Sequence, residues 1–415
     1  MSFQPRPNVL ILYADTGSGH RSVAYAIDSA LHRLTPDVST WESAWETTLQ
    51  NPLLQHPLGR LLDLYGPMTR RTPPLFAEIY RLTDSARVCD LSGRLAYQFL
   101  RDRLNRLIEA TQPAVVVCVH SLLARPMLQA LRRNAYDIPL FSVVTDLASI
   151  HQSWILPDVD QCFVPTVAVR DEMVRRGMRA DQLRVSGLPI HPSYGAQPGA
   201  AVREALRLSM GLHPNRFTVL VMGGGEGVGR LDMIAQHLAE SHLPVQMVIV
   251  AGNNHSLVKR LNALQHRWSM PHKIFGFAHN IPDLMRAADV VITKAGSVTI
   301  AESLASGLPI ILSSVIEGQE SGNVNYLARN GVGELTRRPE EVAAAVRRLL
   351  SMDEELLRDL RARARRLSMP AAAFHVAGHI LDAVDRGCWR DPDAQVSAQG
   401  LISPVPMLTS PGAVS

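Results

Sequence analysis

A glycine-rich turn that ends in a histidine lies close to the start of the chain, in the stretch TGSGHRS. Gly17 and Gly19 permit a tight turn, and His20 follows them just before a helical pattern begins. The N-terminus of a helix lowers the pKa of an imidazole, which keeps the ring neutral and able to accept a proton near pH 7. Two more polar side chains, His120 and Asp146, end apolar runs that are typical of buried strands. These residues predict a cleft in which His20 acts as a base, although a lone histidine can also be a structural cap.

A second glycine-rich turn, in VMGGGEGVGRLDM, follows an apolar run near the middle of the chain and opens a helical pattern. Its glycines let the backbone approach an anion closely, and the helix N-terminus offers free N–H groups and the positive end of a dipole. We expect a diphosphate to bind at the glycines of this turn: Gly223, Gly224, Gly225, Gly227 and Gly229. The turn lacks the GK[ST] ending of a Walker A loop and does not fit the dinucleotide fingerprint. Glycines in such turns can also serve packing.

The stretch DVVITKAGSVTIAESLASGLP has the same form, with Gly296 in its turn and Ser297 and Thr299 as candidate helix caps. Glu302 falls near the start of the helix, where a carboxylate can accept hydrogen bonds from both hydroxyls of a ribose. The alternative is a favourable interaction of this charge with the helix dipole. The turn GQESGN then carries polar side chains suited to the hydroxyls of a sugar: Gln319, Glu320 and Asn323.

Two series of short apolar runs, which alternate with helical patterns, must position these side chains. The first series lies within residues 8–166 and the second within residues 217–314, and a Gly- and Pro-rich stretch at 187–200 separates them. Continuous apolar strands are typical of parallel sheets that helices cover on both faces. We therefore predict an α/β fold of two doubly wound parallel sheets, with ligands bound beyond the carboxyl ends of the strands.

The predicted domains cover residues 1–195 and 200–386, and a tail of residues 387–415 follows. Two domains are the default expectation for a chain of 415 residues. The segment from residue 340 to about residue 386 has helical periodicity. The tail lacks that periodicity and is rich in Pro, Ser and Gly, so we expect it to be disordered.

Composition and charge narrow the class of protein. Hydrophobic residues make up 46% and charged residues 19% of the chain, as in an ordinary soluble α/β protein. No run of about 18 apolar residues and no signal-peptide pattern occur, so we expect neither a membrane-spanning helix nor secretion. The net charge of +4 is mild, and no nucleic acid is expected as a partner. The chain has no CxxC pair among its cysteines, which predicts a reducing cytoplasm and no structural zinc: Cys89, Cys118, Cys162 and Cys388. Cys118 and Cys162 lie in apolar, strand-like runs, and we expect both to be buried free thiols.

One segment mixes basic and apolar residues, GRLLDLYGPMTRRTPPLF, with Arg60, Arg70 and Arg71 among Leu, Tyr, Met and Phe. Such a segment can rest on an anionic bilayer surface. A solvated loop over a core helix is the alternative.

Taken in order, the motifs resemble one family: TGxGH, VHS, TD…H..W, GLP, MGGGEG, GF..N.P, TKAG..TIAE..ASGLPIIL and GQE.GN. From about residue 8 to about residue 333 the chain resembles the monogalactosyldiacylglycerol synthases and the processive diacylglycerol glucosyltransferases of bacteria. Both belong to glycosyltransferase family 28. The resemblance implies a GT-B fold, in which two Rossmann-like domains face a cleft. The N-terminal domain would take the acceptor and associate with the membrane, and the C-terminal domain would bind the nucleotide sugar. Ser18 stands where a third glycine is common in the family.

The resemblance implies a role for each candidate residue of the donor side. The expected contacts to diphosphate and sugar are Gly223, Gly224, Gly225, Glu226 and Gly227. Phe277 and Asn280 would border the uracil. Gly296 and Thr299 would contact phosphate, and Glu302 would bind the ribose. The hexose would contact Gln319, Glu320 and Asn323.

On the acceptor side, His20 matches the histidine that is favoured as catalytic base in this family. Trp154 matches a tryptophan associated with lipid recognition, and we expect its indole to anchor at the headgroup level of a bilayer. The acceptor set also includes Gly17, Gly19, His120 and Asp146.

The expected activity is inverting transfer of galactose or glucose from a UDP-sugar to 1,2-diacylglycerol, which gives a β-monoglycosyldiacylglycerol. The UDP-sugar is a co-substrate, no cofactor is expected, and the lack of a DxD-like acidic cluster predicts that no metal is needed. The expected location is the cytoplasm, at the anionic inner face of the cell membrane. Three alternatives remain: a transferase to another lipid or polyprenyl acceptor, a UDP-sugar epimerase of the GT-B type, and a non-catalytic nucleotide-binding regulator.

Overall fold

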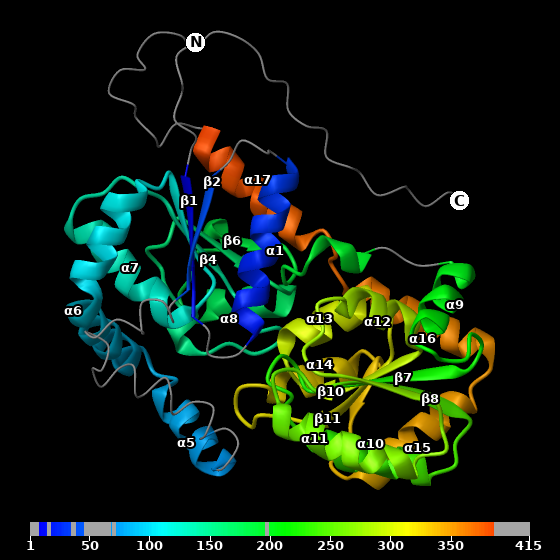
Figure 1. Ribbon diagram of the computed structural model, residues 1–415. Coiled ribbons are helices and arrows are strands. Elements are labelled where there is room, and N and C mark those ends of the chain that lie inside the picture. The colour runs from blue at the N-terminus through cyan, green and yellow to red at the C-terminus, as the bar shows by residue number, and fades with distance from the viewer. Residues whose placement is uncertain are drawn as a thin grey trace, which may run out of the picture.

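The computed structural model describes residues 8–14, 18–34, 39–44, 68, 72–195 and 199–385 of the 415-residue chain. These residues form two α/β units, each built around a parallel sheet of six strands (Figure 1). The prediction of two doubly wound parallel sheets is confirmed. Several sequence predictions fall outside the described residues, namely those on Gly17, on Arg60, Arg70 and Arg71, on Cys388 and on the tail 387–415.

The first sheet and the helices around it form the N-terminal lobe. The strands lie in the order β2-β1-β3-β4-β5-β6, and every neighbouring pair is parallel. They are β1 (Asn8–Tyr13), β2 (Ser39–Ala44), β3 (Val115–Cys118), β4 (Leu140–Val143), β5 (Gln161–Val164) and β6 (Leu183–Val185). The α-helices are α1 (Ser18–Leu34), α5 (Pro73–Thr83), α6 (Ala86–Thr111), α7 (Ser121–Arg133) and α8 (Val167–Arg175). Short 3₁₀ helices are η2 (Gln152–Trp154), η3 (Ala180–Gln182) and η4 (Pro192–Gly195).

The second sheet and its helices form the C-terminal lobe. Its parallel strands lie in the order β12-β11-β10-β7-β8-β9. They are β7 (Phe217–Met222), β8 (Val245–Val250), β9 (His272–Phe275), β10 (Val290–Lys294), β11 (Ile310–Ser314) and β12 (Gly333–Leu335). The helices are α9 (Ala200–Ser209), α10 (Leu231–Glu240), α11 (His255–Leu264), η5 (Gln265–Arg267), α12 (Ile281–Ala287), α13 (Ser297–Ala305), α14 (Ser321–Arg329), α15 (Pro339–Leu350) and α16 (Glu354–Leu367).

The apolar runs form parallel sheets because both faces of each sheet are covered. Every residue of β3 and of β8 is buried, and a strand covered on both sides needs apolar side chains throughout. One cluster of buried side chains fills one face of the first sheet, and a second fills one face of the second sheet. A third cluster contains residues of both sheets, together with α1 and α13. One continuous cluster of buried apolar side chains therefore extends from one lobe into the other.

Each sheet reverses its strand order beside its first strand, and the loops after the strands on either side of that point carry the candidate motifs. His20 follows β1 and His120 follows β3 in the N-terminal lobe. Gly223 follows β7 and Gly296 follows β10 in the C-terminal lobe. Open α/β sheets bind ligands at these switch points, outside the carboxyl ends of the strands. The topology thus brings four separate motifs to two ligand-binding edges.

The last helix, α17 (Ala372–Asp385), returns to the N-terminal lobe and packs against α1 (Figure 1). By chain order it falls in the predicted C-terminal domain, residues 200–386. Its inward residues are fully buried: Ala373, Val376, Ala377 and Ile380. The lobes are therefore connected twice, between β6 and α9 and again between α16 and α17.

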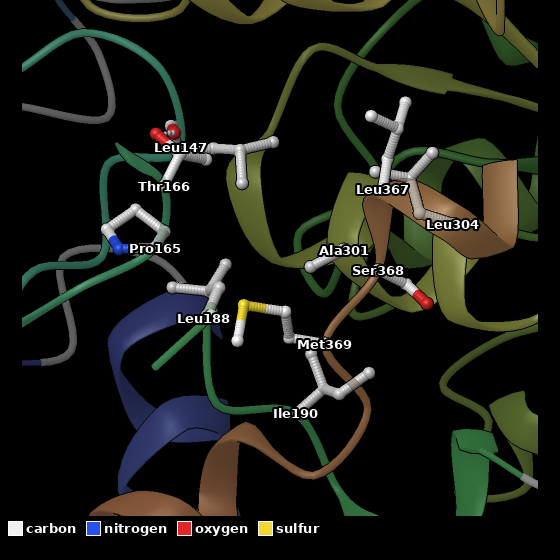
Figure 2. Close-up of a pocket in the computed structure, with 11 residues that line it drawn as sticks. Leu147, Pro165, Thr166, Leu188, Ile190, Ala301, Leu304, Leu367, Ser368 and Met369 are labelled. Atoms are coloured by element: carbon white, nitrogen blue, oxygen red, sulfur yellow. Dashed lines mark hydrogen bonds between the residues drawn. The ribbon is translucent and has the colours of Figure 1, made fainter. Parts of the chain in front are cut away.

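A small apolar pocket lies where these two connections pass each other (Figure 2). Leu188 comes from the first connection, Met369 from the second, and Leu304 from α13. Gly187 has a φ of +85°, and a Cβ atom at this position would lie 2.4 Å from the Cβ of Met369. Glycine is required here because any side chain would push the two connections apart.

Within the described part of the chain, every helix is too short or too polar to cross a membrane. Cys118 and Cys162 are buried free thiols, as the sequence predicts, and Cys89 is a buried free thiol as well.

Candidate functional site

His20 lies in the first turn of α1, beyond the carboxyl end of β1. Its Nδ1 is 2.9 Å from the carbonyl oxygen of Val119 and 3.1 Å from the hydroxyl oxygen of Thr145. Because a carbonyl only accepts hydrogen bonds, Nδ1 carries the proton and Nε2 keeps its lone pair. Burial lowers the pKa of His20 to about 4, against the opposing effect of the Val119 carbonyl. The ring is therefore neutral at pH 7, with Nε2 as its basic atom.

His120 lies beside His20, with the ring centroids 4.2 Å apart and the planes tilted by 50°. Its Nδ1 accepts a hydrogen bond of 3.2 Å from the backbone N–H of Leu122 and caps α7. The proton of His120 is therefore on Nε2. Burial, and then the neighbouring His20, hold the pKa of His120 well below its ordinary value. Two neutral imidazoles of opposite tautomer thus lie side by side.

Asp146 accepts a hydrogen bond of 2.7 Å from the indole N–H of Trp154. Burial raises the pKa of Asp146 to about 6; the charge of Glu320 acts in the same direction, and the indole N–H opposes both. The Trp154 side chain is only 2% exposed and packs in the core of the N-terminal lobe. The prediction that its indole anchors at headgroup depth is therefore wrong. The ring lies inside the lobe, where its N–H holds Asp146.

The glycine-rich turn after β7 folds back on itself and on the turn after β8. A Cβ atom at Gly223 would lie 2.3 Å from the carbonyl oxygen of Val228. Gly227 has a φ of +55°, and a Cβ there would lie 1.9 Å from the carbonyl oxygen of Ala251. These two positions need glycine for close packing of the backbone, which is the alternative that the sequence leaves open.

Ser18 joins this turn to the opposite lobe. Its hydroxyl oxygen accepts a hydrogen bond of 3.2 Å from the backbone N–H of Gly225. A Cβ at Gly19 would lie 3.6 Å from a methyl group of Val298, so the first turn of α1 contacts both glycine turns of the C-terminal lobe. His20 belongs to this same helical turn. The proposed base and the expected diphosphate turn are therefore parts of one interface. Glu226 is exposed beside it.

The turn before α13 ends at Gly296, which occupies the N-cap position of the helix. Thr299 is buried in the first turn. Glu302 accepts a hydrogen bond from the hydroxyl of Tyr194, a residue of η4. Burial raises the pKa of Glu302 to about 7, while the Tyr194 hydroxyl acts to lower it. Sequence analysis missed Tyr194, because its stretch carries the Gly and Pro residues of a linker and no chemical pattern.

Of the three polar residues predicted to meet a hexose, Asn323 is 2% exposed. Its amide nitrogen donates to the carbonyl oxygen of Ala295 at 2.8 Å and to the hydroxyl of Ser297 at 3.2 Å. Asn323 therefore braces the turn before α13 from behind. Gln319 is half-buried, and its carbonyl oxygen accepts a hydrogen bond from Ser149 of the other lobe at 3.4 Å.

The third residue of that set, Glu320, forms an ion pair with Lys294. The distance between Lys294 Nζ and Glu320 Oε1 is 2.6 Å, and the Glu320 side chain is 7% exposed. The other carboxylate oxygen accepts a hydrogen bond from the backbone N–H of Ile316 at 2.9 Å. Sequence analysis missed Lys294 as a site residue. The available signal was its place at the end of a strand, in the TKAG stretch of a chain that has only three lysines.

Phe277 and Asn280 follow β9, at the same edge of the second sheet. The Phe277 side chain is 49% exposed, and its ring meets that of His279 edge-on with centroids 4.9 Å apart. Asn280 is exposed at the N-cap position of α12, with no side-chain capping bond. An exposed flat ring of this kind offers a surface for a base.

In the described ranges, no group of three or more His, Cys, Asp or Glu side chains is arranged to hold a metal ion.

Comparison with known families divides the chain as its two sheets do. Residues 20–190 match the monogalactosyldiacylglycerol (MGDG) synthase family, and residues 218–373 match the glycosyltransferase family 28 C-terminal domain. The chain is 33% identical over 409 residues to monogalactosyldiacylglycerol synthase 2 of Arabidopsis thaliana, a chloroplastic protein. That alignment covers 94% of this chain and 83% of the relative. The chloroplastic MGDG synthase of Spinacia oleracea is 32% identical, with 91% of this chain and 72% of the relative covered.

Solved structures with low sequence identity share the fold. MurG of Acinetobacter baumannii superposes with a TM-score of 0.58 at 15% identity, and covers 91% of this chain and 100% of its own. UDP-GlcNAc 2-epimerase from Neisseria meningitidis, solved with UDP-GlcNAc, has a TM-score of 0.57 at 13% identity, with 90% and 100% covered. These likenesses show the two-domain GT-B arrangement and nothing further about chemistry.

Proposed function

Because the chain belongs to the monogalactosyldiacylglycerol synthase family of glycosyltransferases, we propose that it transfers a hexose from a UDP-sugar to the free hydroxyl of 1,2-diacylglycerol. The transfer inverts the anomeric centre and gives a β-monoglycosyldiacylglycerol. The observation that carries the proposal is the first turn of α1, in which Ser18 bonds to the glycine turn after β7 and His20 presents an unprotonated Nε2. The residues proposed as the base and as the diphosphate-binding turn therefore belong to one interface.

In the proposed reaction, Nε2 of His20 accepts the proton of the acceptor hydroxyl as its oxygen forms a bond to the anomeric carbon. The bond between that carbon and the diphosphate oxygen breaks on the opposite face, and UDP leaves with the electron pair. The carbonyl of Val119, 2.9 Å from Nδ1, fixes the tautomer and stabilises the imidazolium that forms. The diphosphate places negative charge near the ring, which raises the pKa of His20 from its ligand-free value toward that of an efficient base.

On the donor side, the diphosphate is proposed to lie against Gly224, Gly225 and the N-terminus of α13, where N–H groups meet the charge of the leaving group. Glu302 is proposed to give up its hydrogen bond to the Tyr194 hydroxyl and to accept hydrogen bonds from the ribose hydroxyls instead. Gln319 and Glu320 are proposed to contact the hexose, and Phe277 the uracil. No metal or cofactor takes part in this proposal.

A lipid acceptor is supported by an apolar surface on two helices of the N-terminal lobe, the α5–α6 face. Its large apolar side chains are exposed and spaced to share one side of each helix: Leu75, Ile79, Leu82, Val88, Leu91, Leu95 and Phe99. Another side of α5 contacts the loop that carries Gln319 and Glu320, because a Cβ at Gly318 would lie 3.3 Å from the Tyr80 ring. We propose that this face rests on the inner face of the cell membrane, from the cytoplasm, and brings the acceptor to His20.

The direct test is to incubate the full chain with diacylglycerol in anionic vesicles and with UDP-galactose or UDP-glucose separately. Chromatography identifies the glycolipid, and the coupling constant of its anomeric proton reports β configuration. A product of α configuration contradicts inversion. Conversion of a UDP-sugar to its epimer without transfer contradicts the transferase.

The membrane surface is tested by vesicle flotation of the double variant Leu91→Glu/Phe99→Glu. Two charges on the α5–α6 face should abolish binding to anionic vesicles. Leu208→Glu is the matched control, since Leu208 is an exposed apolar residue of α9 in the other lobe. Equal loss in both variants contradicts the assignment of this face.

A further inference from the structure

Lys294 and Glu320 form a half-buried ion pair at the point where the loops of the proposed donor site meet. Lys294 is the last residue of β10, and the ladder to β11 slips by one residue between Thr293 and Lys294. The extra residue at this slip, Ser313, lies on β11. Here the lysine side chain turns toward the two glycine turns that follow β7 and β10.

Two glycines make room for the ammonium group. A Cβ atom at Gly296 would lie 2.9 Å from Lys294 Nζ, and a Cβ at Gly224 would lie 3.6 Å from Lys294 Cε. Any side chain at position 296 would occupy the space of the ammonium. Gly296 is also the N-cap of α13, so the ammonium lies beside the positive end of a helix. A lysine is a costly neighbour for a helix N-terminus unless negative charge is present.

Glu320 supplies that negative charge in this structure. Its Oε1 is 2.6 Å from Nζ, and its Oε2 accepts the backbone N–H of Ile316 at 2.9 Å. The side chains of Lys294 and Glu320 are 25% and 7% exposed. The pair is therefore largely shielded from solvent, and its attraction is stronger than that of a surface ion pair.

We propose that Lys294 binds the diphosphate of the donor, and that Glu320 is the internal counter-ion that the diphosphate displaces. This inference rests on the proposed function and adds a residue to it. When the diphosphate enters, Nζ exchanges a carboxylate oxygen for a phosphate oxygen. The carboxylate of Glu320 is then released to accept hydrogen bonds from hexose hydroxyls. No covalent bond changes in this exchange. The Lys294 ammonium therefore couples diphosphate binding to the release of the Glu320 carboxylate, which can then bind the hexose.

The exchange predicts a difference between ligands with and without phosphate. Calorimetric titration of the full-length protein with UDP and with uridine, at one low salt concentration, measures it. Lys294→Met should weaken UDP binding by about 10- to 100-fold, because a charge-assisted contact to phosphate is lost, and should change uridine binding by less than about 2-fold. Lys294→Arg keeps the charge and should stay within about 3-fold of the wild type for UDP.

Two further variants separate the role of Lys294 from effects on folding and total charge. Glu320→Gln removes the competitor, so UDP should bind at least as tightly as to the wild type. The double variant Lys294→Met/Glu320→Gln leaves no unpaired buried charge. Its affinity for UDP should still fall, and its affinity for uridine should not. Lys259→Met is the matched control, because Lys259 is an exposed lysine of α11 in the same lobe, and it should bind both ligands as the wild type does.

Unchanged UDP affinity in Lys294→Met, or an equal loss for UDP and uridine, overturns the proposal and makes Lys294 a structural residue. A wild type that binds neither ligand overturns this inference and the donor half of the proposed function together. If UDP and uridine bind in the predicted pattern but no sugar is transferred to diacylglycerol, the inference about Lys294 is supported and only the proposed function is overturned.

Discussion

The hydroxyl oxygen of Ser18 and the backbone nitrogen of Gly225 are 3.2 Å apart across the interface between the lobes, and the N–H donates to the hydroxyl. In the proposed function a phosphate oxygen of the donor accepts this N–H, so an oxygen atom of the N-terminal lobe occupies the position that the phosphate would take. A donor that uses this N–H must displace Ser18. Because His20 shares the helical turn of Ser18, the proposed function couples donor binding to the position of the base.

Ser18→Ala removes the internal competitor for the Gly225 N–H. UDP should bind about 2- to 10-fold more tightly, which corresponds to the net free energy of one hydrogen bond. Calorimetric titration measures the change. Ser22→Ala is the control, since the Ser22 hydroxyl bonds to the Ser18 carbonyl within α1 and does not reach the other lobe. Weaker UDP binding in Ser18→Ala would show that the serine assists the donor.

His20→Ala removes the proposed base and should lower kcat by about 10²- to 10⁴-fold, with the dissociation constant of UDP changed by less than about 3-fold. The reason is that Nε2 acts directly on the acceptor hydroxyl, whereas the diphosphate affects the ring only through its charge. Steady-state kinetics and UDP titration give the two numbers. His32→Ala deletes an exposed imidazole of the same helix and should keep full activity. A retained kcat in His20→Ala removes His20 from the role of base.

Trp154→Phe deletes the indole N–H that Asp146 accepts. A buried carboxyl oxygen then lacks its donor, so the free energy of unfolding should fall by about 1–3 kcal/mol in urea denaturation. The bond lowers the pKa of Asp146, so that pKa should rise further. Vesicle flotation should not change, because Trp154 is buried. Trp268→Phe is a control that removes a comparable bond, to Gln236, in the other lobe. Selective loss of flotation in Trp154→Phe would restore the lipid anchor.

Glu302→Gln should change how stability depends on pH. Burial raises the pKa of Glu302 from 4.5 to about 7 in the folded chain. Between these values the unfolded chain releases a proton that the folded chain keeps, so this residue makes the unfolding free energy fall as pH rises. The glutamine variant loses that contribution. The stability difference, wild type minus variant, should therefore decrease from about pH 5 to pH 7 and become constant above. A difference that is constant across this range refutes the raised pKa.

The positions of the motifs at strand ends could be predicted from the sequence, because buried parallel strands are continuous apolar runs and their ends are marked by glycine. Val115–Cys118 and Phe217–Met222 are such runs. His120 lies two residues after the end of the first run, and Gly223 directly follows the second. Such runs are recognised locally, without knowledge of the partner strand. The same signal does not mark β2, β6 and β12, whose sequences STWESA, LRV and GEL are polar or short, and the sequence analysis missed these strands.

Contacts between distant residues could not be predicted in the same way. Gly227 looks like a phosphate glycine in the sequence, but the carbonyl of Ala251 is what requires it. Trp154 matches a lipid-binding position, yet the folded chain packs it into the core of the N-terminal lobe, where its N–H bonds to Asp146. Lys294 forms an ion pair with Glu320, 26 residues later in the chain, and no residue pattern marks that pair. In each case the deciding partner becomes visible only when the chain is folded.

The return of α17 to the first lobe also sets an order of events during synthesis. The inward side of α1 is covered by side chains from residues 373–380, which leave the ribosome after almost every other described residue. The N-terminal lobe is thus made first but completed last, and until α17 is made the nascent chain exposes the apolar residues of α1 that this helix covers. Truncation before α17 should consequently damage the half of the molecule that was translated earliest.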